Sequence, residues 1–259
     1  RSFALLSAIL LGDKSAMEKS DQQVFSETGT MHVMAVSGLH VGLIATLIFS
    51  LSPKIPGKRR AWLRFAVLMI GIWGFVLISG AKPSAIRAGL MFSLFFMGRA
   101  LDRNGHPLNA LFVAMFAMCL FNPRIIYDLG FQFSVMAVMS ILIYTRYITP
   151  FYKPESAFLN GLWQITSVSI AVQVLLAPLS IYYFHQFPVA FIPANLIALP
   201  LASILLIGGI LTIFIFLFFP IVGKSMGIIM DGICQTGFEL LTLLHQTSSW
   251  NLSDLWPET

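Results

Sequence analysis

Long apolar runs are the feature that most limits how this chain can fold. A run of about 20 apolar residues crosses a bilayer as a helix, because the hydrocarbon core is about 30 Å thick. Composition agrees, since 57% of the 259 residues are hydrophobic and 10% are charged, against about 25% charged in soluble domains. We predict an all-α fold, a polytopic transmembrane helical bundle with about eight crossings. The expected crossings are 31–52, 62–80, 84–101, 108–122, 129–147, 162–184, 189–220 and 226–246.

The start of the chain is more polar than the rest. Residues 12–30 mix both charges with a few apolar side chains, and Ser15 with Glu18 has the spacing of a helix capping box. This pattern favours an amphipathic helix lying on the membrane surface. We therefore expect an extracytoplasmic or interfacial segment over 1–30 and a transmembrane domain over 31–259.

Basic residues indicate the orientation of the expected helices. The chain carries a formal net charge of +5, and Lys and Arg collect on cytoplasmic loops of membrane proteins. If the turn that holds Lys54 and Lys58 is cytoplasmic, alternate crossings place Arg99, Arg146 and Lys224 on the same side. The pattern predicts that both ends of the chain lie outside.

Prolines interrupt two of the apolar runs. The run 189–220 is longer than one crossing needs, and in it Pro200 follows Asn195. Proline removes a helical hydrogen bond, and an amide in lipid needs a partner. The pattern predicts at least one broken or re-entrant helix, with Asn195 at the break. Gln173 and Pro178 suggest a second break, and both places are as compatible with a purely structural role.

A serine and a histidine lie three residues apart in the block MAVSGLHVG. Ser37 and His40 share a helical face at this spacing, and Gly38 with Gly42 allows the backbone of another helix to come close. A packed contact with a hydrogen-bonded histidine explains the block structurally. A pore or gate role and a serine nucleophile with a histidine base are the alternatives.

Two basic residues enter the next run in SGAKPSAIRAG. Pro83 stands at an expected helix start, Lys82 precedes it, and Ser84 with Arg87 falls on one helical face. Arg87 extending to the membrane interface is one interpretation. The other is a cation that lines an aqueous path for an anion, because arginine stays charged and binds phosphate through two parallel hydrogen bonds.

An acidic block follows a helix-breaking Asn–Pro pair in NPRIIYDLGFQFS. Asp128 and Gln132 lie one turn apart where the next run begins. Asp128 has the charge to neutralise Arg87 in a buried pair. A structural role and a functional role therefore both remain open for this aspartate.

Motifs for bound metals and nucleotides are not found in the sequence. It contains no HExxH, Walker A, GxGxxG or zinc-type Cys/His pattern, and Cys119 and Cys234 stand alone in apolar runs. We expect no metal, no cofactor and no enzymatic activity of this chain.

Several blocks, in their order and spacing, resemble the competence domain of the ComEC family of DNA-uptake channel proteins. Together they cover most of the chain, and the serine-histidine, proline-arginine and Asn–Pro blocks are specific in combination. The resemblance places Ser37, Gly38 and His40 in one family block. The matching blocks are 32–43, 80–91, 102–111, 122–138 and 195–201.

The resemblance implies a multi-pass protein of the bacterial inner membrane that passes one strand of transforming DNA into the cytoplasm. Partners would be single-stranded DNA, membrane lipid, an OB-like and a metallo-β-lactamase-like domain of the same protein, an external motor and DNA receptor proteins. We expect the chain, which starts at Arg1, to be a fragment of that longer protein. Our hypothesis is that Lys82 and Arg87 contact phosphates. The candidates for an intramembrane polar route or gate are Ser37, Gly38, His40, Ser84, Asp128, Gln132 and Asn195.

Three other functions compete with the channel. A secondary transporter would bind a small anion near Arg87 at the membrane midplane. An intramembrane hydrolase would use Ser37 and His40. A structural assembly role would leave transport unaffected when the charge of Arg87 is removed.

Overall fold

The structure is a computed structural model that describes residues 2–34, 36–51, 58–101, 106–187, 189–247 and 252–253. Ten α-helices make up most of the described chain, and two short strands, β1 (Gln186–Phe187) and β2 (Leu252–Ser253), pair antiparallel. The helices are α1 (Ser2–Leu11), α2 (Lys19–Glu27), α3 (Gly38–Leu51), α4 (Lys58–Ile78), α5 (Pro83–Ala100), α6 (Pro107–Phe121), α7 (Leu129–Ile148), α8 (Ala157–Phe184), α9 (Phe191–Phe218) and α10 (Pro220–Thr247), with 3₁₀ turns η1 (Met31–Met34), η2 (Pro123–Tyr127) and η3 (Thr149–Phe151).

The all-α fold of a polytopic membrane protein is confirmed. Every expected crossing contains a helix, and five helices in the described ranges are long and apolar enough to cross a bilayer. The helices α3 and α6 are apolar but have 14 and 15 residues, about 21 to 23 Å at 1.5 Å per residue. The number of eight crossings therefore stays a prediction. The five long spans are 61–78, 129–151, 157–184, 191–218 and 220–246.

The expected break within 189–220 is not found, because α9 continues as one helix of 28 residues with Pro200 inside it. The neighbouring helix α8 likewise continues through Pro178. Pro193 lies in the first turn of α9, where an N–H has no helical partner to lose. The interruption lies instead in the expected crossing 31–52, where η1 ends at Met34 and α3 begins only at Gly38.

The chain divides into two compact units. The terminal unit comprises residues 1–35 and 143–259, and the central unit comprises residues 36–142. Because the boundary falls at 142/143, the helix α7 contributes its first part to the central unit and its last turns to the terminal unit. Each unit has its own hydrophobic core.

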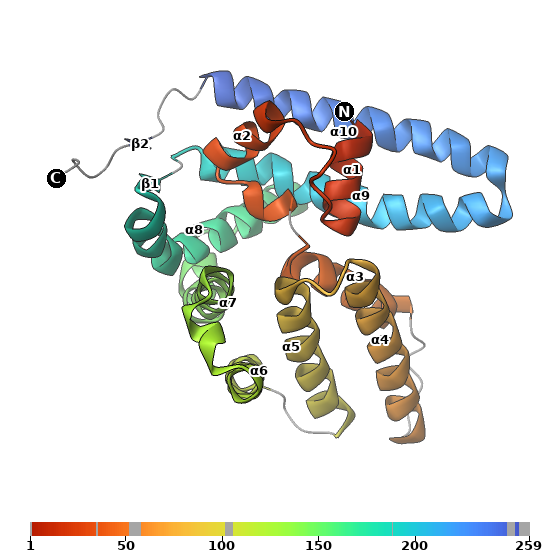
Figure 1. Cartoon of the computed structure of the whole chain (residues 1–259), viewed down its shortest axis with the longest axis vertical. Coiled ribbons are helices and arrows are strands. Elements are labelled where there is room, and N and C mark those ends of the chain that lie inside the picture. The colour runs from red at the N-terminus through yellow and green to blue at the C-terminus, as the bar shows by residue number, and fades with distance from the viewer. Residues whose placement is uncertain are drawn as a thin grey trace. The chain divides into compact units, whose positions relative to one another are not determined.

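The terminal unit is built around α9 and α10, which run beside each other as a helical hairpin (Figure 1). Glycines allow their close approach. A Cβ atom placed on Gly223 would lie 2.5 Å from Phe216 Cα, and one on Gly208 would lie 2.5 Å from Met230 Sδ. The first helix, α1, packs its apolar face into the same core.

The amphipathic helix of the first thirty residues exists but begins later than predicted. The helix α2 starts at Lys19 with Glu18 as its N-cap, and no side chain caps it, so the Ser15–Glu18 capping box is not formed. Its apolar residues Val24 and Phe25 are buried in the core of the terminal unit. Contacts with α10 and η1 thus account for the apolar face of α2.

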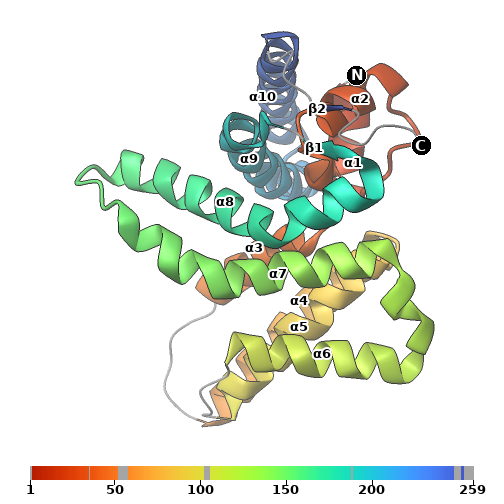
Figure 2. The same cartoon turned by 90° about the vertical axis from the view of Figure 1, so that its left-hand side faces the viewer.

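The central unit is a bundle in which α3, α4 and α5 contact one another and α6 packs on α5 (Figure 2). Fully buried side chains from all three of α3, α4 and α5 form its main core. Trp73 Nε1 donates to Ser93 Oγ at 3.1 Å between α4 and α5. The core residues include Val41, Ala45, Ile72, Val76 and Ala85.

Candidate functional site

Ser37 and His40 meet at the start of α3. Ser37 stands just before the helix, where its carbonyl oxygen accepts the first helical bond from Val41. The Nδ1 atom of His40 lies 3.0 Å from Ser37 Oγ and accepts the Ser37 backbone N–H at 3.3 Å. An N–H can only donate, so Nδ1 carries no proton in this arrangement. The imidazole thus caps α3 from the third helical position, as a glutamate does in a capping box.

The helix start of α3 packs directly on α5. Ser84 Oγ donates to the carbonyl oxygen of Val36 at 2.5 Å. One helical turn further along α5, Ala88 Cβ would lie 3.8 Å from a Cβ on Gly38. The structure therefore joins the serine-histidine block to the proline-arginine block. A Cβ on Gly38 would make an ordinary van der Waals contact with Ala88, so close packing alone does not require glycine at this position.

The turn before α5 fixes the position of Lys82. The helix α4 ends at Ile78, and Gly80 follows at φ 80°. The bonds from Gly80 N to Leu77 O and from Ala81 N to Val76 O close a Schellman motif. Ala81 also adopts a left-handed φ of 48°, which is uncommon for a residue with a Cβ. Lys82 is the N-cap of α5 and is half-buried, with Pro83 at the first helical position.

Arg87 is buried in the central unit. Its side chain is 5% exposed, and Nη2 donates to the carbonyl oxygen of Gly130 at 2.8 Å. The guanidinium carbon lies 6.0 Å from the centre of the Phe131 ring. The Nε atom has no hydrogen-bond partner among the described residues. Arg87 thus connects α5 to the first turn of α7.

Asp128 lies at the same helix start but does not form the predicted ion pair with Arg87. Its Oδ1 atom accepts the Phe131 backbone N–H at 2.7 Å, and among the described residues no carboxylate oxygen lies within 4.0 Å of the Arg87 guanidinium. Asp128 caps α7 instead, where a carboxylate also complements the positive end of the helix dipole. The aspartate and the arginine therefore hold the same turn through different backbone atoms.

Gln132 and the Asn–Pro pair complete this end of α7. Gln132 Nε2 donates to the carbonyl oxygen of Ile126 at 2.9 Å. Asn122 Oδ1 accepts the backbone N–H of Arg124 at 3.2 Å, and Pro123 follows it at the first position of η2. The predicted interruption at Asn122 is confirmed, since α6 ends at Phe121.

Asn195 lies in the terminal unit and is therefore not grouped with the residues above. Its Nδ2 atom donates to Ser169 Oγ at 3.2 Å, which links α9 to α8. Its Oδ1 atom is buried without a described partner. The residue joins two long helices, in the way polar side chains hold transmembrane helices together.

The sequence did not reveal several partners of these side chains. Ser84 and Arg87 bond the carbonyl oxygens of Val36 and Gly130. These are backbone groups, so the residue types in the sequence do not indicate them. The ion pair between His245 Nε2 and Glu27 Oε2, at 2.5 Å, joins residues far apart in sequence. Within the described residues, no group of three or more His, Cys, Asp or Glu side chains is placed to hold a metal ion.

Comparison with known proteins agrees with the resemblance seen in the sequence. The family model described as Competence protein matches residues 9–258. Over 80% of this chain, the ComE operon protein 3 of Bacillus subtilis (strain 168) is 28% identical, and the match covers 26% of that protein. The Recombination protein 2 of Haemophilus influenzae (strain ATCC 51907 / DSM 11121 / KW20 / Rd) is 25% identical over 80% of this chain and 28% of its own length.

The Competence protein ComA of Neisseria gonorrhoeae is 25% identical over 76% of this chain and 28% of its own length. The chain thus spans little more than a quarter of these curated relatives. No solved structure matches it. The match of the family model over residues 9–258, together with the blocks that meet around α3, α5 and α7, shows that the chain belongs to the Competence protein family and is ComEC-like.

Proposed function

We propose that the chain forms part of a channel that passes single-stranded transforming DNA across the inner membrane of a bacterium. The observation that carries this proposal is Arg87. A guanidinium is charged at every physiological pH, and this one lies inside an apolar bundle with no described carboxylate within 4.0 Å. Asp128 attracts this cation electrostatically but forms no ion pair with it, so the guanidinium keeps hydrogen-bond capacity for an anion, and DNA supplies phosphates.

The rest of the proposal follows the sequence and the family. Eight crossings with both ends outside agree with the basic loops. The membrane domain would act with lipid, with an OB-like and a metallo-β-lactamase-like domain of the same protein, and with an external motor and DNA receptor proteins. Lys82, at the N-cap of α5 and half-buried, would meet the strand before Arg87 does.

The hydrogen bond from Arg87 to Gly130 gives this proposal a specific form. Because the bond fixes the first turn of α7, a phosphate that binds Arg87 must compete for or share Nη2. Nε has no described partner but is buried, so a phosphate reaches it only if the neighbouring side chains move. A lysine at this position keeps the charge but presents it as a point, without the planar fork of the guanidinium. Lysine should therefore support uptake better than alanine and less well than arginine.

The test uses cells that carry the full-length protein with Arg87→Ala, Arg87→Lys or Arg124→Ala. Arg124 is the matched control because it lies in the same unit and is exposed. We expect Arg87→Ala to lose most internalised radiolabelled DNA while surface-bound DNA and membrane abundance persist, and Arg87→Lys to retain part of it. Normal internalisation by Arg87→Ala at normal abundance contradicts the phosphate contact and favours a purely structural arginine.

A second candidate function rests on the contact between Ser37 Oγ and His40 Nδ1. At 3.0 Å, with an Nδ1 atom that can accept a proton, this pair has the distance that a nucleophile and its base need. A hydrolase predicts that a serine-directed covalent probe labels Ser37 and that His40→Ala abolishes the labelling. Absence of labelling in the folded full-length protein excludes this function.

A further inference from the structure

Polar residues form one stripe along α10. Lys224, Asp231, Gln235, Glu239 and Gln246 follow one another at spacings of seven, four, four and seven residues. These steps return to nearly the same angle on a helix of 3.6 residues per turn. The stripe therefore runs along one face through most of a helix that is otherwise apolar enough to cross the bilayer. Exposed Ile228 interrupts it between Lys224 and Asp231.

The buried face of α10 lies on a different side of the helix from the stripe. Met230, Cys234, Phe238 and Leu241 are buried, and they pack with α9 and α1 in the core of the terminal unit. Four members of the stripe are exposed, and only Asp231 is half-buried. The described residues of the terminal unit thus leave the stripe uncovered.

Lipid is a poor neighbour for this face. Ionisable side chains at membrane depth face water or other polar groups, because hydrocarbon does not solvate them. Gln235 Nε2 donates to Asp231 Oδ2 at 3.0 Å, which satisfies one carboxylate oxygen only. Among the described residues, no basic side chain forms an ion pair with Asp231 or Glu239. The apolar positions Ile229 and Leu240, on another face of the same helix, are suited to lipid and are also exposed.

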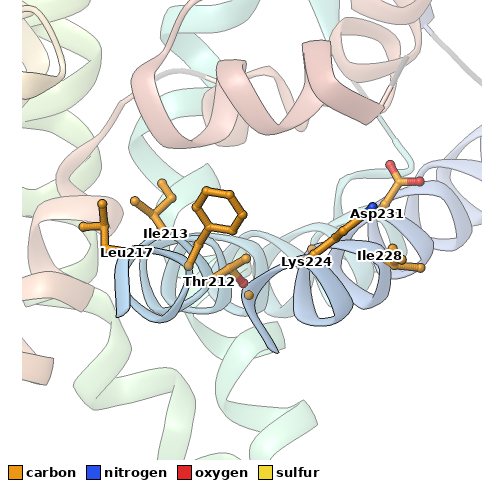
Figure 3. A pocket seen from close by; sticks show the side chains of 9 residues that line it. Thr212, Ile213, Leu217, Lys224, Ile228 and Asp231 are labelled. Atoms are coloured by element: carbon orange, nitrogen blue, oxygen red, sulfur yellow. The ribbon is translucent and has the colours of Figure 1, made fainter. Parts of the chain in front are cut away.

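A groove adjoins one end of the stripe. It has a volume of about 490 Å³ and lies between the end of α9 and the start of α10 (Figure 3). Ile213, Phe216 and Leu217 form its α9 side, while Lys224 and Asp231 belong to its α10 side. Figure 3 shows the Lys224 side chain extended along α10 in the direction of Asp231.

Charge argues against a second copy of the chain as the cover. Two copies inserted in the same orientation and related by a two-fold axis would bring each stripe against itself. Asp231 would then face Asp231, and Glu239 would face Glu239. Like charges in such contact are destabilising.

We propose that the stripe face of α10 lines a water-filled cavity at membrane depth, which opens at the groove beside Lys224. The cavity carries two carboxylates along its length and one ammonium group, Lys224, at its opening, so its net negative charge favours small cations over phosphate. It is therefore separate in chemistry from the arginine site of the central unit. The inference does not depend on the proposed transport of DNA.

Thiol accessibility in the full-length protein tests the cavity. Cys119 and Cys234 are first replaced by alanine. Single cysteines are then placed at Gln235 and Glu239 on the stripe, and at the matched controls Ile229 and Leu240, and membranes are treated with small charged methanethiosulfonate reagents. A thiol reacts as its thiolate, and transfer of a thiol from water to an apolar medium raises its pKa by a unit or more. The stripe cysteines should therefore react at least about tenfold faster than the controls, and a cationic reagent should react faster than an anionic one at Gln235→Cys.

A difference below tenfold between stripe and control positions overturns the proposal, because it means that lipid or a protein segment covers both faces alike. Equal rates for the two reagents at Gln235→Cys contradict the cation preference. DNA uptake is measured in the same cells. If uptake persists while the stripe fails to react, the cavity is rejected and the channel proposal is unaffected.

Discussion

The two units differ in where their polar side chains lie on the helices. In the central unit they gather at helix starts, where His40 caps α3 and Asp128 caps α7. In the terminal unit they lie along helix flanks, as Asn195 does on α9 and Gln235 does on α10. A helix start offers unpaired backbone N–H groups, so a polar side chain there finds a partner locally. A polar group on a flank needs another side chain or water, and the two units therefore differ in what a substitution removes.

The largest effect on stability is expected where the terminal unit depends on close helix packing. Gly223→Ala places a Cβ 2.5 Å from Phe216 Cα, and a backbone atom cannot move aside as a flexible side chain does. We expect a loss of about 1–3 kcal/mol in the free energy of unfolding, measured by thermal denaturation in detergent. Gly232→Ala on the same helix is the control, because its Cβ meets nothing within 4 Å, and it should be neutral or stabilising, since alanine favours helix over glycine.

A substitution at a helix start in the central unit should lower the free energy of unfolding by less than Gly223→Ala does. Ser37→Ala removes the hydroxyl that meets His40 Nδ1, and we expect a loss of about 1 kcal/mol in the free energy of unfolding, the usual net contribution of one hydrogen bond. Ser37→Thr should restore most of it, because threonine keeps a hydroxyl that can donate to Nδ1. Equal stability of the wild type and Ser37→Ala would show that the Ser37 backbone N–H bond to His40 suffices. Denaturation in detergent measures all three proteins.

A contact between helix flanks should contribute less to stability than the contact at the helix start. The bond between Asn195 and Ser169 crosses between two long helices, and such bonds average about 0.6 kcal/mol in membrane proteins. A double-mutant cycle with Asn195→Ala and Ser169→Ala isolates the coupling energy. A coupling near zero would mean that water or lipid headgroups replace the bond in the variants.

The smallest effect concerns acid stability. Gln23 Nε2 and His245 Nε2 both bond the carboxylate of Glu27, and together they hold the pKa of Glu27 below its ordinary 4.5. A depressed folded-state pKa contributes stability above pH 4.5 that is lost as the pH falls through the lower folded value. Because Glu27 is partly exposed, we expect a few tenths of a kcal/mol. Denaturation of Glu27→Gln between pH 3 and 7 should show a flatter profile than the wild type, and parallel profiles would assign the acid response elsewhere.

The sequence predicted the helices well because apolar runs of membrane length leave few alternatives. The expected break at Pro200 was wrong, since a proline in a long helix can leave the helix continuous when neighbouring helices hold it. Opposite charges at Arg87 and Asp128 predicted an ion pair, yet both residues found backbone partners at the start of α7. Backbone groups are present at every position, so no residue pattern identifies which of them a side chain will meet. The role of Asp231 and Glu239 also depended on knowing which face of α10 is buried.

The division of the chain into units sets an order of events during synthesis. Central-unit helices follow one another in sequence and can pack as each is inserted. The helix α1 ends at Leu11, but its partner α9 begins only at Phe191. At about 5–20 residues per second, α1 waits roughly 10 to 35 s for that partner. During this interval its apolar face, with Leu5 and Ile9, meets only the part of its core that α2 and η1 supply, and the N-terminal segment is then most dependent on lipid or on insertion factors.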